Sequence, residues 1–138
     1  MTGDHYELDG IAVPGDMEQL HDLLEQASAE HPHVPAADVM MFETAVMELA
    51  NNVVEHGRPE GQVRWQFSLR VLPDALTARL SDSGEEYPGW HTTGVPDMPG
   101  ETAESGRGLA LASAVLDELD YQRVDGVNTW VMRRNLTA

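Results

Sequence analysis

Three polar side chains of different chemistry recur at four-residue spacing, in the order Glu48, Asn52 and His56. Residues at i and i+4 are neighbours on one side of a helix, so a helix here places the three side chains along one line. An Asn carbonyl is a hard oxygen ligand that Mg²⁺ accepts beside phosphate oxygens, and a carboxylate one turn away can act as a general base. The segment therefore predicts a site that combines metal ligation with proton transfer.

An acid-glycine turn follows downstream, in Asp82-Ser83-Gly84. Asp82 ends a predicted strand, where its carboxylate can accept a hydrogen bond from the exocyclic amine of adenine. Gly84 would let the chain pass close to the base. An Asx turn is the structural alternative, because any Asp-x-Gly sequence can form one.

A glycine-rich turn comes next, formed by Ser105, Gly106, Arg107 and Gly108 and followed by Leu109. The two glycines are expected to precede a helix, so that unhindered N–H groups at the helix start would face phosphates. A hinge that only supplies flexible backbone is the alternative. A Glu and an Asn at i,i+4 can likewise serve only to solvate a surface edge. The three features in this order favour a nucleotide-binding pocket.

Hydrophobic periodicity predicts the elements that position these residues. Asp16 is the expected N-cap of the first helix, and Gly57 the expected left-handed C-cap of the second. His56 lies at that C-terminus, where a capping or charge role is favoured over catalysis. Met47 and Val54 point away from the core stripe of the same helix, which leaves a homodimer open. Helices are expected over 16–31, 35–57 and 108–119, and strands over 5–13, 62–72, 75–81, 120–124 and 128–135.

The segment between Gly84 and Ser105 breaks the periodicity with Glu, Pro, Gly and Thr. A long segment of this kind in a compact domain is typical of a functional lid or of disorder, and a mobile lid is expected over about 85–105. The order of strand, two helices, two strands, lid, helix and two strands predicts an α+β fold. We expect a two-layer sandwich with the helices on one face of a mostly antiparallel sheet, in one domain over 1–138.

Composition restricts the partners. The chain has 138 residues, with 24 acidic against 8 basic side chains and a net charge of -16, which argues against nucleic acid. The same charge favours a basic protein partner or serves solubility. There is no cysteine, so disulfides, thiolate metal sites and a thiol nucleophile are excluded, and a zinc site is not expected. Neither a secretory signal nor a membrane-spanning segment is evident, so we expect a cytoplasmic protein.

The same motifs carry a family resemblance. Glu48-x-x-x-Asn52-x-x-x-His56 resembles the N-box of the Bergerat-fold, histidine-kinase-like ATPases, and Asp82-x-Gly84 resembles their first glycine box. The second glycine box is similar to Gly106-x-Gly108-Leu109. Within this superfamily, the two N-terminal helices and the Glu-Leu-x-x-Asn-x-x-x-His-Gly form are similar to the anti-sigma factor serine-protein kinases of bacterial stress and sporulation control. The resemblance runs from about 16 to 134.

The resemblance implies ATP and Mg²⁺ as cofactors, with Glu48 as the catalytic base and Asn52 as the metal contact beside phosphates and waters. It implies sequestration of a sigma factor and phosphorylation of an anti-anti-sigma antagonist protein on Ser or Thr. The residues that it assigns to ATP binding are Asn52, Asp82, Gly84, Ser105, Gly106, Arg107, Gly108 and Leu109.

Two departures from the family pattern bear on phosphoryl transfer. Glu86 stands where many relatives of the wider superfamily have a glycine, and Glu104 stands where similar kinases can carry an arginine. Arg107 is the residue that can supply that charge instead. A regulator that binds nucleotide without moving phosphate is therefore the alternative function. The catalytic domain of a histidine kinase is a third class, but no dimerisation helix with an acceptor His is evident.

Overall fold

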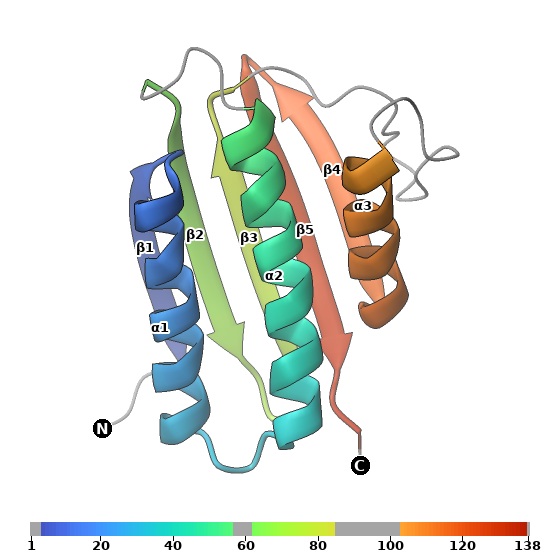
Figure 1. Cartoon of the computed structure of the whole chain (residues 1–138). Coiled ribbons are helices and arrows are strands. Elements are labelled where there is room, and N and C mark those ends of the chain that lie inside the picture. Colours follow the sequence, from blue (N-terminus) through green and yellow to red (C-terminus); the bar gives the residue numbers. More distant parts are fainter. Residues whose placement is uncertain (1–3, 57–61, 85–102, 138) are drawn as a thin grey trace.

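Three helices cover one face of a single five-stranded sheet (Figure 1). The computed structural model describes residues 4–56, 62–84 and 103–137. The sheet has the order β1-β2-β3-β5-β4, and each neighbouring pair is antiparallel. The two-layer α+β sandwich predicted from the sequence is confirmed. Its elements are β1 (His5–Ile11), α1 (Pro14–Glu30), α2 (Ala36–His56), β2 (Arg64–Val71), β3 (Ala75–Asp82), α3 (Ala103–Val115), β4 (Glu118–Val124) and β5 (Val127–Asn135).

The core lies between the two layers. In β2, exposed and buried side chains alternate, as expected for a strand with one covered face. The helix α2 contributes an apolar stripe at helical spacing, and this stripe packs on the sheet. The stripe consists of Phe42, Ala45, Val46, Leu49 and Val53, each with an exposed fraction of 0%. Met47 and Val54 are partly buried against the same core, so the expectation that they point away from it is wrong, and a homodimer stays a prediction.

The predicted start of α1 is also wrong. The helix begins at Pro14, because a proline at the first helical position loses no hydrogen bond that the helix needs. Val13 is the N-cap and makes no side-chain cap. Asp16 lies in the first turn instead, and its carboxylate accepts a hydrogen bond from the backbone N–H of Ile11 at 2.8 Å. Asp16 thus joins β1 to α1 rather than capping the helix.

The boundaries of α3 differ from those predicted. The helix covers Ala103–Val115, whereas helical spacing alone indicated 108–119. The backbone N–H of Asp117 already donates to the carbonyl of Arg133 at 2.8 Å, and pairing with β5 begins at Glu118. Leu119 is therefore buried by strand alternation and not as part of a helix. The predicted cap Gly57 and the predicted lid over about 85–105 lie outside the described residues, except for the end of the lid segment from 103 on.

Several element ends meet at one end of the molecule, at the top of Figure 1. The helix α2 ends there, β3 ends there, and α3 begins there. The β4–β5 turn lies at the same end. Most of the predicted site residues of α2, β3 and α3 lie near these ends, so the fold brings them toward one region.

Candidate functional site

Asn52 sits beside the core stripe of α2. Its neighbours Leu49 and Val53 are fully buried, and its own side chain is 3% exposed. Glu48, one turn earlier, is half-buried. Packing on both sides of Asn52 holds the helix backbone, so the carboxamide has little freedom to move away.

The carboxamide of Asn52 has an unsatisfied atom. Within the described residues, its Nδ2 has no hydrogen-bond partner although it is buried. A buried polar group left unpaired costs about 1–3 kcal/mol, so such a group in a folded protein calls for a ligand or a further partner. Oxygen and nitrogen of an amide are told apart by their hydrogen-bond partners, and a flip of the Asn52 amide would place its oxygen where the unsatisfied Nδ2 now lies. The position suits a cation that takes oxygen ligands.

Asp82 is buried at the end of β3, with an exposed fraction of 3%. Its Oδ1 accepts a hydrogen bond from the backbone N–H of Gly84 at 2.8 Å. This is the Asx-turn contact that the sequence offered as an alternative. The turn contact holds the Asp82 carboxylate at the end of β3, an inner strand of the sheet.

The sequence did not reveal the side chains that surround Asp82. Asn128, fully buried on β5, donates from Nδ2 to Asp82 Oδ1 at 3.0 Å. The oxygen of Asn128 accepts hydrogen bonds from Tyr121 and from Arg123, the latter at 2.8 Å. Arg123 also donates to the carbonyl of Gly84 at 2.9 Å. We refer to Asp82, Gly84, Tyr121, Arg123 and Asn128 as the Asp82 network.

The signal for this network was weak in the sequence. Asn128 follows the Asp125-Gly126 turn and so resembles an ordinary turn residue. Only the strand register shows its role, because Asn128 lies opposite Asp82 in β3 and opposite Arg123 in β4.

The glycine-rich segment is placed differently from the prediction. Gly106 and Gly108 lie inside α3, which begins at Ala103, and do not precede it. The first turn of a helix leaves N–H groups without intrahelical partners, and this turn includes Ser105. Leu109 is 8% exposed and belongs to the core. The side chains of Glu104, Ser105 and Arg107 lie outside the described residues, as do the side chain of His56 and all of Glu86.

A family model decides the classification. The model described as the histidine kinase-like ATPase domain matches residues 12–134. The chain belongs to this family. The matched range includes α2, β3 and α3, and therefore every predicted site residue of this histidine kinase-like ATPase domain.

The fold is also similar to the crystal structure of the RsbU and RsbW domains of Rv1364c from Mycobacterium tuberculosis, with a TM-score of 0.70 and 18% identity. The match covers 96% of this chain and 32% of that chain. At 18% identity the likeness supports the fold alone. This histidine kinase-like ATPase domain spans about a third of that chain's length. No curated protein matches the chain.

The family implies ATP binding, and the described residues fit it. The buried Asp82 carboxylate offers an acceptor for a base, and the unsatisfied carboxamide of Asn52 offers a polar contact at the same end of the fold. These two features arise on different layers, one on the sheet and one on a helix. Each fits a different part of a nucleotide, the base and the metal-bound phosphates.

Two cavities formed by the described residues lie away from Asp82 and Asn52. Two cavities of about 350 and 340 Å³ are lined by strand residues only and share Arg79. Their lining includes neither Asp82 nor Asn52. They belong to the sheet and not to the predicted nucleotide site of this histidine kinase-like ATPase domain.

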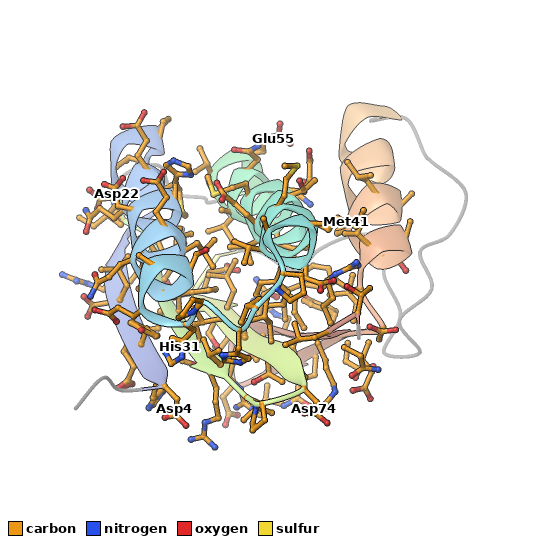
Figure 2. All side chains as sticks on the ribbon, turned by 90° about the horizontal axis from the view of Figure 1, so that it is seen from below. Asp4, Asp22, His31, Met41, Glu55 and Asp74 are labelled. Atoms are coloured by element: carbon orange, nitrogen blue, oxygen red, sulfur yellow. The ribbon has the colours of Figure 1, made fainter. Side chains whose placement is uncertain are left out.

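The helix layer is strongly acidic. Neither α1 nor α2 contains a lysine or an arginine. Asp22 and Glu55, one on each helix, are exposed on this layer (Figure 2). Ligand atoms of His21, Asp22 and Glu25 on α1 lie within 4.8 Å of one another, but all three residues are exposed and none lies on α2 beside Asn52. Among the described residues, no helix is long and apolar enough to cross a membrane.

Proposed function

We propose that this histidine kinase-like ATPase domain is an anti-sigma factor that holds a sigma factor and phosphorylates an antagonist protein on a serine or threonine. The observation that carries the proposal is the pairing of the unsatisfied, buried Asn52 with Glu48 one helical turn before it. The Glu-Leu-x-x-Asn-x-x-x-His-Gly form of this segment and the similarity to a structure with a domain named RsbW support this class.

The proposal gives Asp82, Asn52 and the start of α3 separate roles in nucleotide binding. Asp82 accepts a hydrogen bond from the base amine. Asn52 contributes its oxygen to Mg²⁺ beside the phosphates, and N–H groups at the start of α3 hold the phosphates. When bound, Mg²⁺ supplies positive charge against the phosphates, which a protein with a net charge of -16 otherwise lacks.

Glu48 is the proposed general base. Its carboxylate takes the proton of the antagonist's hydroxyl group while that oxygen bonds to the γ-phosphorus and ADP leaves with the electrons of the broken P–O bond. Its half-buried position leaves it accessible from outside the core. The acidic helix layer would speed the approach of a basic partner, since charge complementarity acts mainly on association rates.

The alternative is a protein-binding regulator that responds to nucleotide without transferring phosphate. Glu104 favours this alternative, because it places a negative charge in the glycine-rich segment where similar kinases can carry an arginine. Both functions require the same protein contacts to the adenine ring and to Mg²⁺. Only the fate of the γ-phosphate separates them.

Incubation with γ-labelled ATP and candidate antagonist proteins tests the proposal. We expect label on a serine or threonine of one antagonist, and a loss of about 100-fold or more in rate for Glu48→Gln with nucleotide affinity within a few-fold, the scale of a lost general base. Glu18→Gln, an exposed carboxylate on α1, is the matched control and should transfer phosphate normally. Binding of ATP without any transfer supports the regulator, and full transfer by Glu48→Gln removes Glu48 from the mechanism.

A further inference from the structure

We propose that Asn128, held by Arg123 and Tyr121, positions the Asp82 carboxylate and thereby sets the preference of the site for a 6-amino purine. The inference rests on the proposed nucleotide site and assigns its base specificity to residues of the β4–β5 hairpin. Asn128 is a positioning residue here, because it acts through Asp82 and not on the base.

The orientation of the Asn128 carboxamide is decided by its neighbours. Arginine has only donors, so the atom of Asn128 that lies 2.8 Å from Arg123 Nη1 must be its oxygen. The nitrogen then faces Asp82, at 3.0 Å from Oδ1. Tyr121 donates to the same oxygen of Asn128. The usual ambiguity of an amide is therefore absent at this position.

Two donors to Asp82 act on the same carboxylate oxygen. The backbone N–H of Gly84 and the amide nitrogen of Asn128 meet at Oδ1, at 2.8 and 3.0 Å. Two donors from different elements fix the plane of the carboxylate, and both require that it accepts hydrogen bonds. An amine at position 6 of a purine can donate to such a carboxylate, whereas the carbonyl of a 6-oxo purine in the same pose opposes it with another acceptor.

Arg123 connects Asn128 to the turn at Gly84. Its Nη1 donates both to Asn128 and, at 2.9 Å, to the carbonyl of Gly84. One guanidinium thus holds the residue that orients Asp82 and the glycine that borders it. Loss of Arg123 should loosen both contacts together.

The β4–β5 hairpin fixes this arrangement through its turn. Asp125 and Gly126 have positive φ values of 52° and 78°, as a tight two-residue turn requires. The turn sets the register that places Asn128 opposite Arg123, and a slip of one residue would move Asn128 to the other face of the sheet. Tyr121 packs on Trp130, with ring centroids 4.7 Å apart, which holds the hydroxyl group toward Asn128.

Calorimetric titration with ADP and IDP tests the inference, because these nucleotides differ at position 6 of the purine. We expect the unmodified protein to prefer ADP. Asn128→Leu should weaken ADP binding by about 10-fold, the scale of a hydrogen bond to a charged group, and leave IDP binding within about two-fold. Thr129→Val is the matched control, since Thr129 is the next residue and bonds to Ser81 at 3.2 Å outside the network. It should keep the ADP-to-IDP ratio.

If Asn128 has only a structural role, Asn128→Leu should weaken the binding of ADP and of IDP by the same factor. That result overturns the inference. In an Asp82→Asn background, Asn128→Leu should not change the ratio further, because the two residues act as one unit. If Asn128→Leu does not fold, Arg123→Gln replaces it in the test, because Arg123 is only half-buried and its substitution disturbs the core less. An unchanged ratio in that variant then contradicts the inference. Absence of ADP binding by the unmodified protein would overturn the proposed function itself, whereas ADP preference retained in the variants overturns the inference alone.

Discussion

Arg134, near the end of β5, forms a partly buried ion pair with Asp38 in the first turn of α2. Its Nε donates to Asp38 Oδ1 at 2.9 Å, and the two side chains are 14% and 0% exposed. The other oxygen of Asp38 accepts hydrogen bonds from the backbone N–H and the hydroxyl group of Thr137, at 3.0 and 2.9 Å. Arg134 also donates to the carbonyl of Val115 at the end of α3. One guanidinium thus ties the C-terminal strand to two helices.

Arg134→Met should destabilise the protein strongly. Removal of one partner leaves the buried Asp38 carboxylate without its counter-charge, which typically costs about 3–5 kcal/mol. Arg133→Met is the matched control, because Arg133 pairs at 3.8 Å with the well-exposed Glu118 and such pairs contribute about 0–1 kcal/mol. Urea unfolding measures both. Equal free energies of unfolding for the two variants would contradict the assigned role of Arg134.

The stabilising contribution of Asp38 should be lost in acid. Burial opposes ionisation of Asp38, but the hydrogen bonds from Thr137 and the charge of Arg134 outweigh it and lower its pKa below 3.8. Its stabilising contribution is therefore complete above the pKa of the unfolded state, and it is lost as the pH falls through the lower pKa of the folded state. The unfolding free energy of Asp38→Asn, followed from pH 6 to pH 2, should fall less steeply than that of the unmodified protein. Parallel curves would exclude Asp38 as the source of this dependence.

His21 should show the opposite dependence on pH. It contacts Glu43 of α2 from α1, and this hydrogen bond, together with the charge of Glu43, raises the pKa of His21 above 6.5. The contact therefore stabilises the α1–α2 pair fully below pH 6.5 and fades as the pH rises through the raised pKa. An NMR titration of the imidazole protons should give a midpoint above 6.5, and Glu43→Gln should lower it. A midpoint that does not respond to Glu43→Gln would contradict the contact.

Asn52→Ala should weaken nucleotide binding only where Mg²⁺ is present. The carboxamide is the proposed metal contact, so the affinity for ADP in EDTA should change little. The increase in ADP affinity on adding Mg²⁺ should be smaller than in the unmodified protein. Asn51→Ala offers a matched control, because Asn51 is adjacent and exposed. Calorimetry in both buffers measures the difference. If both variants keep the full gain from Mg²⁺, Asn52 is not a metal contact.

Much of the fold could be predicted because its signals are local. Alternation in β2 and the stripe of α2 each follow from one period of hydrophobic residues, and both elements are found where expected within a few residues. The end of α3 could not be predicted in this way. Leu116 and Leu119 satisfy helical spacing, but strand pairing from Glu118 takes Leu119 into β4.

The candidate site was predictable only in part, for the same reason. The sequence pointed to Asp82 because Asp-x-Gly is a local motif. Asn128, Tyr121 and Arg123 escaped notice because their roles depend on pairing between strands, which no short motif encodes. The burial of Asn52 is likewise a tertiary property, set by how α2 packs on the sheet.

The central claim is that Asp82 binds the base of an adenine nucleotide, and calorimetric titration of Mg-ADP tests it most directly. The unmodified protein should bind one ADP, and Asp82→Ala should lose most of that affinity. Asp74→Ala should bind normally, since Asp74 lies in the turn before β3, at the opposite end of the strand from Asp82. No heat from any adenine nucleotide, or equal binding by Asp82→Ala, would contradict the account.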